Sequence, residues 1–419
     1  MKLVHAADLH LDSPLTGLEA YEGAPVDTIR SATRRAFQNL VSLCLEEEAA
    51  LLLLAGDIYD GNWKDYSTGL FFAAELSRLA TAGIDVVMVR GNHDAASNIT
   101  RHLSLPKHVI ELSTTRAETR VFEDRGVAVH GQSFRDRSVQ VDLAANYPPP
   151  VPGLFNVGLL HTSLTGREGH HDYAPCSVET LRARGYDYWA LGHVHRREIV
   201  SEAPYIVYPG NLQGRHHQET GPKGATVITV SDGRVASVEA RVLDVFRFGT
   251  ADVDVTDAAS AEDAVDLARA ALDREVAEAE GRPLGARVIL RGATRAHAAL
   301  FAEPERWENQ IRLEATAEHG ADLWIERVRF ATSQALAAGD LAARDDAVGQ
   351  VIRAIRASRS ETGDERLVRV FDELKKKLPL EVRDGPDPIL LDDPRFIEAL
   401  FDDVERMLVP GLASAGADE

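Results

Sequence analysis

Acidic, amide and imidazole side chains gather in five short clusters along the first half of this sequence, and each cluster follows an apolar run. Asp8 with His10, and His193 with His195, stand two residues apart, a spacing that puts both side chains on one side of an extended chain. Each pair can therefore direct two ligands at one point. The side chains that could bind a metal ion are Asp8, His10, Asp57, Asn92, His161, His193 and His195.

These ligand types suit divalent cations of the hard or borderline class. The set offers oxygen and nitrogen atoms and no thiolate, which fits Mn²⁺, Fe²⁺, Zn²⁺ or Mg²⁺. One carboxylate shared by two ions would hold them ~3.5–4 Å apart, the spacing of two-metal phosphoesterases. A single Asp-x-His is more often a capping Asp beside a surface His, and a single Gly-His-x-His is as compatible with no metal as with one. All five clusters in order, each at the end of an apolar run, predict a two-metal centre.

The apolar runs predict the strands that must position these side chains. Helical patterns at 26–47 and 67–82 separate the first three runs, so we expect parallel strands with helices on the faces. The later runs lie closer together, and part of that half is expected to be antiparallel. Ligands of open α/β sheets lie beyond the carboxyl ends of the strands, so the clusters should converge. The expected strands are 2–7, 50–56, 85–90, 127–131, 155–160, 187–191 and 205–208.

The pattern changes after residue 245. Residues 250–330 combine strand patterns with a helical pattern at 261–280, which predicts a small α+β unit. The sequence beyond it is mostly helical in pattern, with an interruption at Leu378-Pro379. The expected parts are residues 1–245, 246–332 and 333–419.

Composition excludes several classes of protein. Of 419 residues, 44% are apolar and 27% charged, which rules out a wholly disordered or fibrous chain. The longest apolar run, 49–55, is far shorter than the ~20 residues of a membrane span, so no membrane association is expected. Cys44 and Cys176 cannot build a disulfide framework, and the N-terminus has no signal-peptide pattern. A cytoplasmic protein is therefore expected.

The net charge of −20 argues against a chain that coats nucleic acid electrostatically. Residues 1–250 carry 24 Lys and Arg against 30 Asp and Glu, a net of −6, and residues 251–419 carry 22 against 36, a net of −14. Most of the negative charge therefore lies in the second part, and bound metal ions would cancel some of the charge of the first.

The order Asp-x-His, Gly-Asp, Gly-Asn-His-Asp, a His and Gly-His-x-His resembles the motif series of the calcineurin-like metallophosphoesterase superfamily over residues 1–245. The resemblance implies an αββα sandwich, with two mixed sheets flanked by helices, a small α+β capping domain and a helical C-terminal region. It also implies a role for His93, which would stabilise the phosphate or protonate the leaving oxygen while Asp94 orients its ring. In the implied metal assignment Asp8, His10 and His195 hold one ion, Asn92, His161 and His193 hold the other, and Asp57 bridges both.

Within that superfamily, the sequence around the motifs resembles that of the SbcD-like DNA exonucleases, in particular their YhaO-like branch. The resemblance is carried by the runs at 5–12, 56–60, 173–176 and 208–216. It implies Mn²⁺-dependent hydrolysis of DNA phosphodiesters in DNA repair, together with an SbcC-like, YhaN-like ATPase, and a homodimer. Apolar stripes in the C-terminal region would either dock that ATPase or pack in the core.

Alternatives remain open at this point. The same metal centre would serve a cyclic-nucleotide phosphodiesterase or a phosphoprotein phosphatase, whereas a scaffold without activity would be expected to have lost some ligands. Arginines near the motifs, among them Arg215, would either contact phosphates or pair with acidic residues. The remaining histidines near the motifs, which are either surface residues or an additional metal site, are His170, His171, His216 and His217.

Overall fold

The computed structural model divides into two compact units. The first comprises residues 1–215 and 219–247, and the second residues 216–218 and 248–419. The structure describes residues 1–13, 24–60, 67–96, 105–164, 174–334, 345, 347–360, 365–378, 389, 391, 393, 395–401 and 403–404. No helix among these residues is long and apolar enough to cross a membrane.

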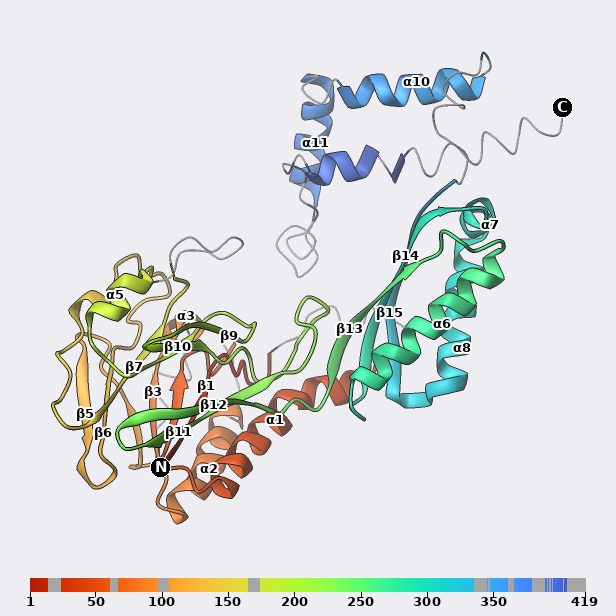
Figure 1. The fold of residues 1–419 in the computed structure, drawn as a ribbon. Coiled ribbons are helices and arrows are strands. Elements are labelled where there is room, and N and C mark those ends of the chain that lie inside the picture. Colours follow the sequence, from red (N-terminus) through yellow and green to blue (C-terminus); the bar gives the residue numbers. More distant parts are fainter. Residues whose placement is uncertain are drawn as a thin grey trace. The chain divides into compact units, whose positions relative to one another are not determined.

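The described part of the first unit contains two mixed β-sheets, as the resemblance implied (Figure 1). In the first sheet, in the order β12-β11-β1-β2-β3-β4, the strands from β1 to β4 are parallel and β11 is antiparallel to β1. Its strands are β1 Lys2–Ala6, β2 Leu51–Ala55, β3 Asp85–Val89, β4 Val109–Glu111, β11 Gly224–Ser231 and β12 Arg234–Val242.

The second sheet runs in the order β5-β6-β7-β8-β10-β9, parallel from β6 to β10 with an antiparallel strand at each end. Its strands are β5 Glu118–Phe122, β6 Val127–Gly131, β7 Phe155–His161, β8 Tyr188–Gly192, β9 Glu198–Glu202 and β10 Tyr205–Tyr208. The expected parallel strands are therefore present in both sheets, and the antiparallel pairing falls in the later half of the unit, as predicted.

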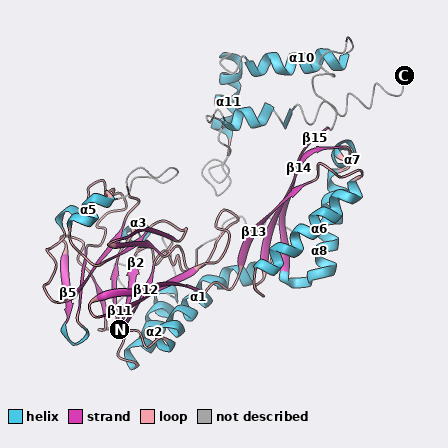
Figure 2. Ribbon diagram, viewed as in Figure 1, coloured by secondary structure: helices cyan, strands magenta, loops and turns pink. Residues whose placement is uncertain are grey.

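The two sheets pack face to face because their strands are apolar on both faces. Leu3, Leu51 and Leu53 belong to a core that also contains Val129 and Val157 of the second sheet. The alternate residues of β1 and β2 face the opposite side, where they meet helices α1 (Val26–Glu46) and α2 (Ser67–Thr81). Figure 2 shows these two helices against the first sheet, and α5 (Val178–Ala183) lies with the second. The layers are those of an αββα sandwich.

The second unit contains a sheet in the order β13-β14-β15, with β14 and β15 parallel. Its strands are β13 Arg247–Asp254, β14 Leu284–Thr294 and β15 Leu323–Gln334, and its helices include α6 Ala261–Glu278, α7 His297–Ala302 and α8 Pro304–His319. Ser260 and Asp263 form a capping box at the start of α6. Helices α10 (Ala347–Ser360) and α11 (Glu365–Lys377) confirm a helical C-terminal region.

Candidate metal centre

The carboxyl ends of β1, β2, β3, β7 and β8 bring the predicted ligands together. Asp8, His10 and His195 form one cluster, and Asp57, His161 and His193 form another. Within each cluster one ligand atom from every residue lies within 4.8 Å of the others. The clusters arise because parallel strands of two packed sheets end on the same side, as the sequence predicted.

Asp57 of the second cluster also lies close to the first. Its Oδ2 atom is 3.4 Å from Nε2 of His161 and 4.0 Å from Nε2 of His10, so one carboxylate oxygen faces a ring nitrogen of each cluster. Burial alone would raise the pKa of Asp57, but the neighbouring imidazoles, His161 first, hold that pKa well below its ordinary value. The side chain is therefore a carboxylate placed where it could contact two cations.

Asn92 completes the second cluster at the N-terminus of α3 (Asn92–Ala96). Nε2 of His161 donates to its Oδ1 over 3.0 Å, while Nδ1 of the same ring donates to the Ala55 carbonyl over 2.9 Å. A ring held at Nδ1 by a backbone carbonyl presents Nε2 to a metal ion, a common arrangement around metal-binding histidines. The Nε2, amide and carboxylate atoms therefore fit a divalent cation of the kind that the sequence predicts.

The first cluster has a matching arrangement. Nε2 of His10 lies 3.2 Å from Nε2 of His195, next to the buried carboxylate of Asp8. Nδ1 of His195 donates to Oε1 of Glu219 over 2.6 Å, so Nε2 is again the ring atom that faces the cluster. Two ring nitrogens that face each other beside a carboxylate are satisfied together by a cation.

Unusual backbone conformations form these turns. The φ angles of Asp8, His10 and Asp57 are 52°, 43° and 53°, in the left-handed region that non-glycine residues seldom occupy. Gly56, with φ 91°, leaves room for His161, because a Cβ there would stand 2.7 Å from Nδ1 of that ring. Strained backbone of this kind concentrates at functional sites. The turns hold the ligand side chains over the ends of the strands.

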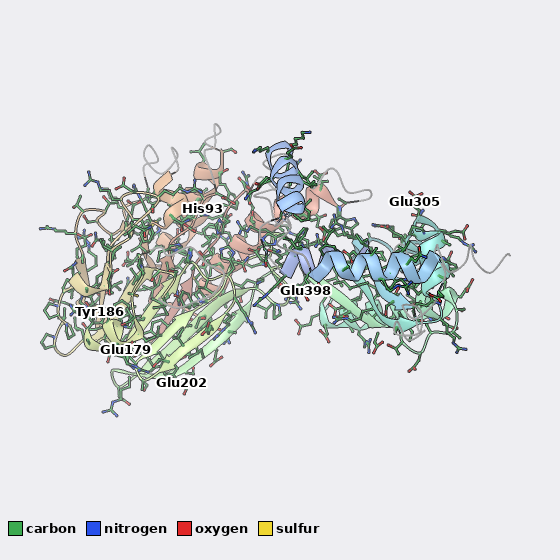
Figure 3. All side chains as sticks on the ribbon, turned by 90° about the horizontal axis from the view of Figure 1, so that it is seen from above. His93, Glu179, Tyr186, Glu202, Glu305 and Glu398 are labelled. Atoms are coloured by element: carbon green, nitrogen blue, oxygen red, sulfur yellow. The ribbon has the colours of Figure 1, made fainter. Side chains whose placement is uncertain are left out.

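The ring of His93, a residue labelled in Figure 3, has Asp60 as its partner. Its Nδ1 atom lies 2.8 Å from Oδ1 of Asp60. Burial alone would lower the pKa of His93, but the hydrogen bond to Asp60 and the charges of Asp57 and Asp60 outweigh it and raise that pKa. Asp60 belongs to the Gly-Asp-Ile-Tyr-Asp run at 56–60, and nothing in that run predicts this role.

The expectation that Asp94 orients the His93 ring is wrong. Asp94 is buried, and its carboxylate accepts backbone N–H groups from Ile58 over 2.9 Å, Tyr59 over 3.0 Å and Gly91 over 3.0 Å. Consecutive residues of a helix point in different directions, so neighbours in the first turn of α3 cannot face one another. Burial and the charge of Asp57 raise the pKa of Asp94 to about 7. Asp94 therefore holds the loop after β2 and the loop after β3 together.

Arg215 has acidic partners in the structure, which is the second of the two roles that the sequence left open. Its Nη1 lies 3.0 Å from Oδ2 of Asp60, and its Nη2 lies 3.1 Å from Oε1 of Glu219. Asp60 also lies close to His10 and His93 in a third group of potential metal ligands. The Arg215 cation already neutralises that carboxylate, so we assign this group to the charged surroundings of the centre.

The two ligand clusters contain neither His216 nor His217 and neither cysteine. His217 Nδ1 is 4.0 Å from Oε2 of Glu326 within the second unit, and the His216 ring is 6.1 Å from that of His217. His170 and His171 lie outside the described residues. Cys44 and Cys176 are buried and unlinked.

Comparison with known proteins agrees with the motif order. Residues 1–197 match the calcineurin-like phosphoesterase family, and residues 248–333 match the middle domain of metallophosphoesterase YhaO. The chain is 33% identical over 296 residues to the uncharacterized metallophosphoesterase YhaO of Bacillus subtilis, an alignment that covers 70% of this chain and 72% of that protein. The chain belongs to the calcineurin-like metallophosphoesterases. Its resemblance to the YhaO-like branch is confirmed.

A metallophosphoesterase is a metal-dependent hydrolase of phosphate esters, and the family uses a dinuclear metal site. A second relative is the DNA double-strand break repair protein Mre11 of Methanopyrus kandleri, 27% identical over 256 residues, which are 56% of this chain and 52% of that protein. The chain therefore spans about half the length of this second relative. The two clusters joined by Asp57 are the candidate dinuclear site of this metallophosphoesterase.

Proposed function

We propose that this metallophosphoesterase is a Mn²⁺-dependent DNA nuclease of the exonuclease type, which acts in cytoplasmic DNA repair with an SbcC-like, YhaN-like ATPase. The observation that supports hydrolysis most directly is the pair of ligand clusters with Asp57 between them and His93 alongside. The choice of DNA as substrate is supported by the similarity to a DNA double-strand break repair protein.

The seven predicted ligands would divide between two cations. Asp8, His10 and His195 would hold one, the second cluster with Asn92 would hold the other, and Asp57 would contact both. When bound, two such ions polarise a phosphoryl oxygen and lower the pKa of water.

The residues of the chain supply the proton transfer. Nδ1 of His93 is bonded to Asp60, which leaves Nε2 to give a proton to the oxygen of the leaving group. The raised pKa of His93 keeps a larger share of the ring protonated near neutrality. A covalent intermediate is not needed, and burial raises the pKa of the Cys176 thiol to about 12, so that residue is a poor nucleophile. Ser163 is buried.

The C-terminal region is the proposed docking surface for the ATPase. Val370 and Leu374 on α11 are exposed, and the basic residues 375–377 follow them at the end of the helix. Amphipathic helices of this kind bind partner helices through their apolar face. Glu at both apolar positions should abolish co-purification with the ATPase and leave the hydrolysis of small phosphodiesters unchanged; retained co-purification would contradict this surface.

A nuclease assay tests the main proposal. Wild type and His93→Ala would be compared on end-labelled duplex and single-stranded DNA, a cyclic nucleotide and a phosphomonoester, each with Mn²⁺ and with EDTA. We expect wild type with Mn²⁺ to degrade DNA from its ends and the variant to be slower by about 10²–10⁴-fold. Turnover of the cyclic nucleotide or monoester with intact DNA would overturn the nuclease assignment and favour a phosphodiesterase or phosphatase.

A further inference from the structure

The loop that follows β10 converges on one buried carboxylate, that of Glu219. Oε2 of Glu219 accepts the backbone N–H of Arg215 over 2.8 Å and the side-chain amide of Asn211 over 2.9 Å. Oε1 accepts Nδ1–H of His195 over 2.6 Å. The Glu219 side chain is 7% exposed, so its charge depends on these donors. This loop therefore holds Glu219 against a predicted metal ligand.

Arg215 joins Glu219 to a second carboxylate. Its Nη2 donates to Oε1 of Glu219 over 3.1 Å, and its Nη1 donates to Oδ2 of Asp60 over 3.0 Å. The Arg215 side chain is 13% exposed. The two carboxylates flank a single guanidinium, whose planar fork can bond to both at once.

The other oxygen of Asp60 holds His93. Oδ1 accepts Nδ1–H of His93 over 2.8 Å, while Oδ2 also accepts the hydroxyl of Ser13 over 2.8 Å. An unbroken series of contacts therefore runs from His93 through Asp60, Arg215 and Glu219 to His195. We name Asp60, Arg215 and Glu219 the charged array.

We propose that Glu219 is a positioning residue for His195 and that Arg215 couples Glu219 to Asp60. Binding of one cation and orientation of the His93 ring then depend on the same charged array. This proposal rests on the proposed function in one respect only, which is that His93 gives a proton to the leaving group. Glu219 selects the ring tautomer that leaves Nε2 of His195 unprotonated and directed at the first cluster. Arg215 fixes the positions of both carboxylates through its two Nη atoms.

Glu219→Gln tests the first step without any substrate. Mn²⁺ would be titrated into the metal-free protein and the two affinities measured by calorimetry, with thermal unfolding as a check of the fold. We expect one site to weaken about 10-fold to 100-fold, the usual cost of losing an outer-shell partner of a metal-binding histidine, and the other to stay unchanged.

Glu239→Gln is the matched control. It makes the same charge change in the first unit, at a residue that pairs with Arg241. We expect the affinities of this control to equal those of wild type. Wild-type affinities in Glu219→Gln, or equal weakening of both sites, would overturn the assignment.

Arg215→Lys tests the coupling at constant charge, because a Lys ammonium is a point charge that lacks the guanidinium fork. We expect the same site to weaken about 10-fold. We also expect a larger rate loss on DNA, whose leaving oxygen needs a proton, than on thymidine 5′-(p-nitrophenyl phosphate), whose leaving group does not. Arg241→Lys on β12 is the matched control and should behave as wild type.

The two readouts separate the two proposals. Wild-type Mn²⁺ affinity and equal rate losses on both substrates in Arg215→Lys would overturn the coupling. Failure of wild type to cleave DNA would overturn the proposed function, while the Mn²⁺ titrations and the chromogenic diester would still test the charged array.

Discussion

Nδ1 of His93 lies 2.8 Å from Oδ1 of Asp60, a residue that follows Asp57 by three positions on the same strand-end loop. One short loop thus supplies the Asp57 carboxylate to the metal clusters and the Asp60 carboxylate to the ring of His93. The two carboxylates face different partners, since Asp57 points at His10 and His161. The loop after β2 therefore sets the distance between the predicted metal ions and the proposed proton donor.

Asp60→Asn should slow DNA hydrolysis by about 10-fold to 100-fold, less than the about 10²–10⁴-fold that general acid catalysis contributes in full. The amide removes the charge that favours the protonated His93 ring. The loss should be smaller for a p-nitrophenyl diester, which needs no proton at its leaving oxygen. Steady-state rates on both substrates measure this, and an equal loss on both would argue against a proton-donor role for His93.

The pH dependence of DNA hydrolysis should report the protonation of His93, whose hydrogen bond to Asp60 raises the pKa of the ring. A general acid is active when protonated, so the rate should fall as pH rises through the pKa of His93. Asp60→Asn removes an interaction that raises this pKa, so the alkaline limb should move to lower pH. Rates at saturating Mn²⁺ between pH 6 and 10 would show the shift, and an unmoved limb would assign that limb to another group.

Metal binding should release protons. In the metal-free protein burial opposes the charged form of His161, but the charges of Asp57 and Asp8 and hydrogen bonds outweigh it and raise its pKa to about 9. A metal ion requires the neutral ring, so affinity for Mn²⁺ should increase with pH up to about 9. The same charged ring stabilises the metal-free protein below pH 6.5, and this contribution is lost as pH rises through about 9. Calorimetry in buffers of different ionisation enthalpy counts the protons; none released at pH 7 would contradict the prediction.

Gly91→Ala should weaken metal binding at moderate cost to stability. A Cβ at this position would overlap Oδ1 of Asp57, the atom that also accepts the backbone N–H of His93 over 2.9 Å. Relief requires Asp57 to move, so we expect weaker binding at both sites and a loss of about 1–3 kcal/mol in the free energy of unfolding. Gly83→Ala is the control for destabilisation alone, since its Cβ would meet no atom within 4 Å and only its φ of 70° disfavours a side chain, so its Mn²⁺ affinities should equal those of wild type. Urea unfolding and Mn²⁺ titration measure both effects.

Much of the centre could be predicted because its signals are local. Asp8, Asn92 and His161 each follow a buried apolar strand, and parallel strands bring such residues together. The partner of His93 could not be predicted, because both Asp94, its neighbour in sequence, and Asp60, on another loop, could pair with the ring. The helical turn at α3 directs Asp94 away and leaves Asp60 as the partner. Glu219 gave no sequence signal, since its role depends on a loop that returns to His195 from 24 residues further along the chain.

Helix α8 shows the limit of periodicity. Its buried residues Trp307, Ile311 and Ala315 follow the helical spacing, but polar and charged residues dominate Pro304–His319, and no helix was expected there. Its stability comes from packing on the sheet of the second unit, through contacts such as the Arg312 Nη1 bond to the Ile325 carbonyl. Tertiary contacts, which a sequence pattern does not display, decide this element.

The face-to-face packing of the first unit makes the metal centre sensitive to chain length. Leu51 and Leu53 face one hydrophobic layer and Leu52 and Leu54 face the other, so removing one residue from β2 would exchange the two layers and turn the following Asp57 away from its partners. Insertions and deletions in this unit are therefore tolerated between the strands and not within them. We therefore expect the spacing of the five motifs to vary among related chains and the distance from each buried strand to its ligand to stay constant.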